Sequence, residues 1–235
     1  YKDPAVWDAM SELKLAGFTD RLGIAPGPAN GFTLDLIYSF EQFGELMDWA
    51  MIILNPLEPW PGRLCLKAAE NAGIDILTRV VDYGGIFHGT MKPDHEFRAG
   101  DHRTYRPSGW VEEGLRRVDN MRSIIDKYDL SELHFSCLWN LSHTPVRSVV
   151  PTFIQEAGDD AKPIEDLVRE YGTLPIESPF SQAEVDEIAA IGDNTGCMML
   201  KGASNRHAES LRPDEWPMRP ELMELADRHG LGSEW

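Results

Sequence analysis

The chain has 235 residues, 42% of them hydrophobic and 26% charged, which is the composition of an ordinary globular protein long enough to bury one substantial core. Its formal net charge of −17 at pH 7 repels nucleic-acid phosphates and anionic membrane surfaces, which argues against partners of either kind. No apolar run approaches the roughly 20 residues that a membrane-spanning helix needs.

The cysteines point to a reducing compartment. Cys65, Cys137 and Cys197 are far apart, odd in number and without a CxxC pair. This pattern is typical of buried free thiols and not of a disulfide framework or a zinc site. The N-terminus has no basic and apolar signal segment, and we therefore expect a cytoplasmic protein.

Helix and strand signals alternate along the first 81 residues. Asp3 and Pro4 begin an apolar-striped helix that Gly17 ends. Strands are expected at residues 21–25, 49–55 and 74–81, with a turn at 26–31, a helix from Thr33 and a short helix ending at Gly73.

A long segment without periodicity, residues 82–109, is rich in Gly, His, Arg and Asp. Loops of this length in compact domains are usually functional or mobile. After it the pattern predicts one helix over 111–125, a helix capped by Ser131 and a strand at 146–151. Three further helices follow, from Pro163 to Tyr171, from the Ser181 capping box to about Ile191, and over 220–229.

Four strand-then-helix units in series predict a parallel sheet covered by helices on both faces. Two architectures fit this order: a small open doubly wound sheet, or four consecutive strands of an eight-stranded barrel. The segments after the strands are long and rich in Gly, Pro and ionisable residues, as expected for a barrel with its site at the carboxyl ends of the strands, but an open sheet has the same asymmetry.

Short motifs occur in a fixed order along these units. A helix and GFTDRLGIA come first, followed by MIILNPLEP, in which Asn55 ends the strand. Next come AAENAGIDILTRVVDYGGIFHG with its Gly85–Gly89 turn, the tripeptide Asp101-His102-Arg103, and LHFSCLWNLSHTPVRSVVP with Trp139 and Pro151. In this order and spacing the segments resemble the second half of the aldo/keto reductase family, over roughly residues 5–190.

The resemblance implies an α/β fold, the (β/α)₈ TIM barrel, that binds NADP(H) or NAD(H). Its implied activity is that of an oxidoreductase interconverting a carbonyl and an alcohol on a sugar or a small aldehyde or ketone. We expect one domain over residues 1–235, with strands five to eight in about 1–175 and a helical extension over about 176–235. The family's catalytic Asp, Tyr, Lys and His lie on the first four strands, so no catalytic residue is assigned in this chain.

The chain begins at Tyr1, directly before a helix signal, and we expect it to be a fragment. Four barrel strands leave two open edges, which predicts either a homo-oligomer or pairing with a chain that carries the missing half.

The family holds the adenosine end of its cofactor after the eighth strand, which implies cofactor-binding roles for a group of residues here. This group comprises Pro151, Thr152, Gln155, Lys162 and Glu165. Lys162 precedes a helix start and suits a 2′-phosphate, whereas Glu156, Asp159 and Asp160 disfavour it. The sequence does not decide between NADP and NAD. It also leaves open that this segment is an acidic, solvated loop that binds no ligand.

Two positions bear on the nicotinamide end. Arg79 replaces the aromatic ring that stacks on the nicotinamide in many family members, and a guanidinium can stack in the same way. The alternative is a structural Arg paired with Asp75 or Asp82. Where the family's fifth strand ends in Ser-Asn, this chain has Ala25, and Met51 stands where a Gln is common. We therefore expect that the carboxamide is recognised by backbone or other groups, with Ala25 among the cofactor contacts, or that its recognition is weakened.

Candidate substrate contacts are Trp60, Tyr83 and His88. The long segment also carries His95, His102, Arg98, Arg103 and Arg106, which predict either a basic rim facing phosphates or a solvated loop. The histidine spacing fits no compact metal-ligand pattern, and no metal is expected.

Two alternative functions stay open. One is a non-catalytic, cofactor-binding regulatory or scaffold subunit of the same fold. The other is an unrelated TIM-barrel sugar lyase or hydrolase using Glu58, Asp82 and His88.

Overall fold

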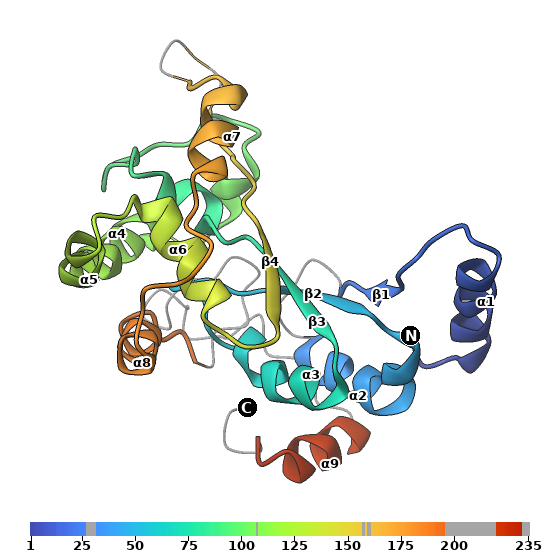
Figure 1. Ribbon diagram of the computed structural model, residues 1–235. Helices are drawn as coiled ribbons and strands as arrows, with labels where there is room; N and C mark the ends of the chain where they lie inside the picture. The colour runs from blue at the N-terminus through green and yellow to red at the C-terminus, as the bar shows by residue number, and fades with distance from the viewer. Residues whose placement is uncertain (27–31, 107, 157, 159–160, 196–219, 232–235) are drawn as a thin grey trace.

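The computed structural model describes residues 1–26, 32–106, 108–156, 158, 161–195 and 220–231. Its centre is a parallel sheet of four strands, β1 (Gly23–Ile24), β2 (Trp49–Ile53), β3 (Asp75–Arg79) and β4 (Val146–Val150), in the order β1-β2-β3-β4 (Figure 1). A doubly wound sheet reverses its strand order at a switch point, whereas neighbouring strands of a barrel keep their chain order. The order therefore decides for four consecutive barrel strands and against the open doubly wound sheet.

Helices connect and follow the strands. The α-helices are α1 (Pro4–Leu15), α2 (Thr33–Phe43), α3 (Leu66–Ala72), α4 (Trp110–Asn120), α5 (Arg122–Lys127), α6 (Glu132–Leu141), α7 (Ile164–Gly172), α8 (Gln182–Ile191) and α9 (Pro220–Arg228). Short 3₁₀ helices are η2 (Gly44–Leu46), η3 (Gly62–Cys65), η4 (Tyr83–His88) and η5 (His102–Tyr105).

The predicted elements are confirmed in type, with shifted ends. Each strand is shorter than its apolar run because the outer residues turn into the loops. The single helix expected over 111–125 is wrong: it breaks at Met121, whose N–H bonds to the carbonyls of both Arg117 and Val118 and tightens the turn. The expected turn at 26–31 lies outside the described residues from residue 27 onward.

Alternate strand residues show that helices fully cover one face of the sheet. Ala50, Ile52, Ile76 and Thr78 are buried, and α3 packs on β3 while α6 packs on β4. The residues between them point to the other face and are only half-buried: Met51, Ile53, Leu77 and Arg79. The expectation that helices cover both faces is wrong for this chain, because the second face is the one that lines the interior of a closed barrel.

Burial of the thiols is confirmed at two of the three cysteines. Cys65 and Cys137 are completely buried, and this burial raises the pKa of each thiol to about 12. Both are therefore protonated at neutral pH and pack as small apolar groups. Cys197 lies outside the described residues.

The C-terminal helices fold back on the barrel segment. α9 lies against α2 (Figure 1), and α8 begins with the predicted capping box between Ser181 and Glu184. Beyond α8, the side chain of Asn194 accepts the N–H of Trp60 at 2.9 Å and donates to its carbonyl at 2.8 Å. The loop after β2 is thereby held by residues more than 130 positions further along the chain. None of the described helices is long and apolar enough to cross a membrane.

Gly192, just after α8, packs closely on the backbone of Pro56 in the loop after β2. A Cβ added there would lie 1.6 Å from the carbonyl oxygen of Pro56, so the backbones must separate to admit any side chain. Gly192→Ala should lower the free energy of unfolding by about 1–3 kcal/mol, the usual cost of overpacking. Gly172→Ala is the matched control, because a Cβ at Gly172 meets nothing within 4 Å. Urea unfolding of both variants measures the difference, and equal stabilities would contradict this close packing.

Candidate functional site

A cavity of about 520 Å³ lies between the segments that leave β3 and β4. Parallel α/β proteins bind ligands at the carboxyl ends of their strands, and both segments start there. From the first segment the cavity is lined by Gly85, His88, Thr90, Met91, Lys92, His95, Arg98 and Arg103. From the rest of the chain it is lined by Leu133, Ile154, Gln155, Glu156, Gly158, Ala161, Lys162, Leu167 and Glu170.

The exit of β3 has an unusual backbone. Gly84 and Gly85 have φ values of 67° and 96°, and the non-glycine residues Val80 and Tyr83 also have positive φ. A Cβ on Gly85 would lie 3.1 Å from the carbonyl oxygen of Ile154, so any side chain there would press on the segment after β4. Such conformations persist where the surrounding structure enforces them, and they cluster at functional sites.

Asp82 joins the two strand exits. Its fully buried Oδ2 accepts the hydroxyl of Thr152 at 2.6 Å, the N–H of Thr152 at 3.1 Å and His88 Nε2 at 3.1 Å. Burial by itself raises the pKa of Asp82, but the hydrogen bonds from His88 and Thr152 outweigh it, and the net shift is downward. Asp82 is thus ionised at neutral pH, while its Oδ1 has no hydrogen-bond partner among the described residues.

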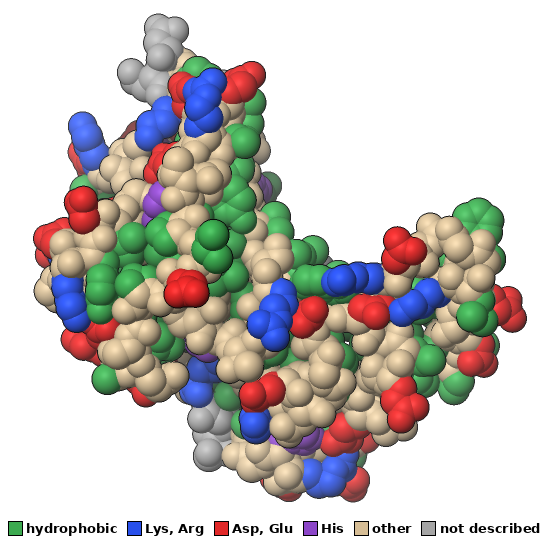
Figure 2. All heavy atoms as spheres, in the orientation of Figure 1, with side chains coloured by type: hydrophobic (Ala, Val, Ile, Leu, Met, Phe, Trp, Pro, Cys, Tyr) green, Lys and Arg blue, Asp and Glu red, His purple; other side chains and the backbone are tan. Residues whose placement is uncertain are grey.

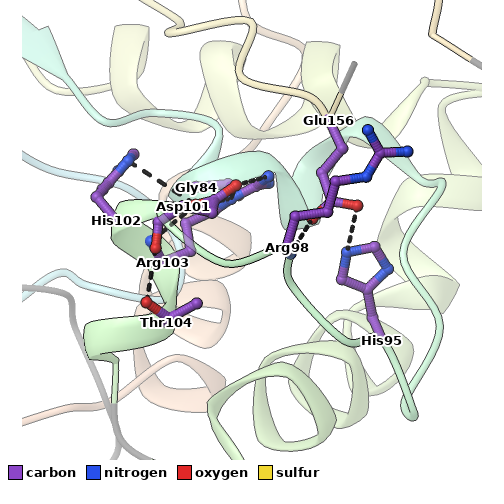
Figure 3. Close-up of polar contacts among 8 residues, drawn as sticks. All are labelled: Gly84, His95, Arg98, Asp101, His102, Arg103, Thr104 and Glu156. Carbon is purple, nitrogen blue, oxygen red and sulfur yellow. Dashed lines mark hydrogen bonds and ion pairs between the residues drawn. The ribbon is translucent and has the colours of Figure 1, made fainter. Parts of the chain in front are cut away.

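The Asp101–Arg103 pair fixes the long segment onto the glycine turn (Figure 3). The Arg103 guanidinium donates to Asp101 at 2.6 Å and holds the pKa of that carboxyl at about 2. The same guanidinium donates to the carbonyl of Gly84 at 3.2 Å and lies 4.5 Å from the centre of the Phe97 ring. The Asp-x-Arg spacing seen in the sequence therefore has a structural role beside the cavity.

Arg106 is a buried cation against the same turn. Its guanidinium lies 4.0 Å from the ring centre of Trp110 and 5.1 Å from that of Tyr83. Its Nε and Nη1 have no hydrogen-bond partner among the described residues. Burial lowers the pKa of Arg106, and the nearby Tyr83, Glu58 and Asp82 partly offset this. A Cβ on Gly84 would lie 2.6 Å from Arg106 Nη2, so the glycine leaves room for this arginine.

Glu156 connects the two walls of the cavity (Figure 3). Its Oε1 accepts the backbone N–H of Arg98 at 3.0 Å, and its Oε2 lies 3.7 Å from His95 Nε2. This carboxylate comes from the segment after β4, and both of its partners come from the segment after β3. Both carboxylate oxygens thus face partners on the opposite wall.

The predicted adenosine-end residues fall into two groups. Gln155 and Lys162 line the cavity, but the Gln155 amide donates to the Lys162 carbonyl at 2.6 Å and accepts its N–H at 2.9 Å, bracing the loop. Thr152 does not line the cavity and donates its hydroxyl to Asp82. Pro151 is buried, and Glu165 is exposed on the first turn of α7 without lining the cavity. Asp159 and Asp160 lie outside the described residues.

The predicted substrate residues are not brought together. His88 lines the cavity, whereas the rings of Trp60 and Tyr83 are buried, at 1% and 3% exposure. Trp60, a candidate substrate contact, is enclosed by Asn194 and Leu64 and does not line the cavity. Of the predicted basic rim, His95, Arg98 and Arg103 line the cavity, while Arg106 lies beneath the turn and His102 projects outward with 60% of its side chain exposed.

Arg79 lies apart from this cavity, on the half-open face of the sheet beside Val150. Burial lowers its pKa and the charge of Glu58 raises it. The partners considered from sequence are engaged elsewhere: Asp75 with Arg147 at 3.2 Å, and Asp82 with His88 and Thr152. Ala25 lies exposed after β1, two strands away from β3.

Sequence reasoning missed Lys92, Thr90 and the roles of Asp82 and Glu156. Lys92 carried a weak signal, since it is a cation in the same Gly- and Arg-rich segment. The Asp82–Thr152 contact joins residues 70 positions apart, and no local pattern encodes it.

No family model matches the chain, and no curated protein matches it. Solved structures do. A glycerol dehydrogenase from Gluconobacter oxydans superposes with a TM-score of 0.61 at 20% identity, over 90% of this chain and 55% of that one. The apo form of an aldo-keto reductase from Bacillus halodurans gives 0.56 at 14% identity, over 82% and 58%, and its holo form gives 0.53 at 13%, over 79% and 53%.

The chain thus spans little more than half the length of the solved structures that it matches. The resemblance to aldo/keto reductases is confirmed at the level of the fold: the chain has the architecture of part of a (β/α)₈ barrel of that type.

Thr152→Val tests the connection between the strand exits. Removing a hydrogen bond to an ionised group should lower the free energy of unfolding at pH 7 by about 1.5–3 kcal/mol. Because the pKa of Asp82 is lowered in the folded state, this contribution is present above the unfolded value of about 3.9 and is lost as the pH falls through the folded value.

In urea unfolding, the difference in the free energy of unfolding between wild type and Thr152→Val should accordingly become smaller as the pH falls. The control is Thr173→Val, whose hydroxyl donates only to the backbone carbonyl of Glu170 on the surface. A difference in the free energy of unfolding that stays constant with pH would contradict the claim that the Thr152 hydroxyl donates to an ionised Asp82.

Proposed function

We propose that the chain is the cofactor-binding part of an NADP(H)- or NAD(H)-dependent oxidoreductase that interconverts a carbonyl and an alcohol. The observation that carries this proposal is the cavity at the exits of β3 and β4, which combines a side-chain-free turn with a local excess of cations. Among the residues that the structure describes, Lys92, Arg98, Arg103 and Lys162 line it against two carboxylates, in a chain whose net charge is −17. Such a pocket suits an anionic ligand that the rest of the surface repels.

The residues present fit the phosphates of a dinucleotide. Gly84 and Gly85 have no side chain at the inner wall, which lets the cation Arg106 and the segment after β4 pack directly on this turn. Arg106 holds buried donors without a partner among the described residues, directly beneath this turn, and a buried cation of this kind favours a nearby anion. Arg103, locked by Asp101, presents a fixed guanidinium at the same wall.

The two ends of the cofactor are assigned to different parts of the sheet. We assign the adenosine end to the segment that begins at Pro151 and Thr152 and continues through Gln155 and Lys162 to Glu165. The nicotinamide end is assigned to the half-open sheet face at Arg79, with Ala25 at the far strand. A bound nicotinamide supplies the hydride. The chain's own groups bind and orient this cofactor, while the residues that move the proton are assigned to the first four barrel strands.

The substrate follows from the same resemblance. A small carbonyl compound or a sugar would approach the nicotinamide on the half-open face, close to Arg79, in the cytoplasm. A regulatory subunit that binds the same cofactor without turnover would use the same cavity, and the two functions differ only in the catalytic half. The lyase or hydrolase alternative has no comparable support, because Glu58 and Asp82 are buried and Asp82 accepts hydrogen bonds from Thr152 and His88.

Tryptophan fluorescence titration with NADPH and NADH tests the proposal, and we expect saturable binding of at least one of them by the 235-residue chain. Arg79→Leu should weaken that binding about ten- to a hundredfold, the loss expected for one contact from a charged group. Arg147→Leu is the control, because Arg147 is an exposed arginine of the neighbouring strand.

Two results would count against these assignments. Absence of binding by either dinucleotide overturns the proposed function. Unchanged affinity in a folded Arg79→Leu variant overturns the role of Arg79 alone.

A further inference from the structure

A second cavity lies on the outer side of the segment that leaves β3. It has a volume of about 500 Å³ and is lined by residues of that segment and of α4, α5 and α6. The surface over α4 and α5 carries both acidic and basic side chains (Figure 2). The side chains on which the chemistry of this cavity depends are apolar or acidic: Met91, Leu115, Val118, Glu112, Asp119 and Glu132. We call this cavity the outer groove.

Glu132, the first residue of α6, has one carboxylate oxygen with a partner and one without. Its Oε1 accepts a hydrogen bond from Arg122, whereas its Oε2 is buried and has no hydrogen-bond partner among the described residues. Gly89 also lines the groove, and a Cβ on it would lie 3.4 Å from this Oε2. A buried acceptor without a donor is costly, and native structures usually satisfy it. The outer groove thus holds an acceptor that a donor from outside the chain can satisfy.

The two arginines that line the groove are already engaged. Arg122 binds the Oε1 of Glu132, and Arg116 donates from Nε and Nη2 to a carboxylate of its own helix, both at 2.8 Å. Glu112 and Asp119 are exposed, and their carboxylates make no hydrogen bond or close ion pair within the part of the chain that the structure describes. The charges at the groove therefore favour a cationic ligand.

Residues 88–93 separate the outer groove from the candidate cavity at the exits of β3 and β4. Thr90 and Lys92 line that cavity. Gly89 and Pro93 line the outer groove instead, and Met91 lines both. The outer groove is therefore a separate space on the other side of one cavity wall, and an inference about it does not rest on the proposed function.

We propose that the outer groove binds an aliphatic ammonium group, which donates a hydrogen bond to Glu132 Oε2. The carbon chain of the ligand then lies along Met91, Leu115 and Val118. An ammonium has three donors and no acceptor, which suits a carboxylate oxygen without a partner. Its carbon chain removes the apolar side chains of the groove from water, while Asp119 at the rim favours the charged ligand over a neutral one. Such a group occurs on free alkylamines and on lysine side chains.

Nuclear magnetic resonance of the 235-residue chain locates the ligand without any substitution. With n-pentylamine as the probe, we expect saturable shifts of the methyl signals of Met91, Leu115 and Val118. One charged hydrogen bond and a short chain should give a dissociation constant on the order of 1 mM. The matched probe is 1-pentanol, which has the same carbon chain without the charge, and it should bind at least about tenfold more weakly.

Glu132→Gln keeps an oxygen for Arg122 and replaces the second carboxylate oxygen by an amide nitrogen. This variant should weaken the binding of n-pentylamine about tenfold. The control is Asp126→Asn, which removes an exposed carboxylate of α5 that also acts on Arg122 but does not line the groove. The affinity of this control for n-pentylamine should be unchanged.

Two peptides distinguish the sources of the ammonium group. Acetyl-Leu-Lys-Leu-amide presents it on a lysine side chain, and the same peptide with an acetylated lysine nitrogen is its uncharged control. Tighter binding of the lysine peptide than of n-pentylamine assigns the groove to the lysine of a partner protein. Equal or weaker binding assigns it to a free amine.

Four results would each overturn the proposal. They are equal binding of n-pentylamine and 1-pentanol, shifts confined to other parts of the chain, an unchanged affinity in a folded Glu132→Gln variant, and no binding by any of the amines. None of them bears on the binding of dinucleotides, so the proposed function is tested separately.

Discussion

The buried carboxylate of Asp82 is the constraint on which the candidate site depends. An ionised carboxylate without water needs donors, and its donors come from Thr152 at the exit of β4 and from His88 on its own segment. The two segments that bound the cavity therefore stay together as long as Asp82 stays charged. Glu156 on the Arg98 backbone repeats this connection further out, and Arg103 on Gly84 braces the segment after β3 within itself.

Much of the fold was accessible from the sequence, because it depends on local signals. The apolar runs at β2, β3 and β4, the Ser181 capping box and the glycine ends of helices each encode their own element. The break at Met121 was missed because its apolar side chain continues the helical stripe while its N–H adopts 3₁₀ bonding. Of the residues that the sequence pointed to, Gln155, Lys162, His88 and Arg103 line the cavity. The burial of Trp60 was not, because Asn194 encloses it from 134 positions away.

The half-open face of the sheet explains why the cavity is enclosed by this chain whereas the surface around Arg79 is not. Four parallel strands of a barrel present one face to helices and the other to the barrel interior. Here the first face is fully covered, whereas Met51, Ile53, Leu77 and Arg79 remain half-buried on the second. The cavity between the exits of β3 and β4 is lined by segments that this chain supplies itself. The surface around Arg79, in contrast, corresponds to the interior of the longer barrels, of which this chain covers little more than half.

Amide hydrogen exchange with and without NADPH tests the central claim most directly, because it locates the ligand without any substitution. We expect NADPH to slow exchange in η4, in residues 90–103 and in residues 152–165, with little change in α1, α2 and α9. Protection confined to the β1–β2 side of the sheet, or equal protection throughout the chain, would contradict a dinucleotide held between the exits of β3 and β4.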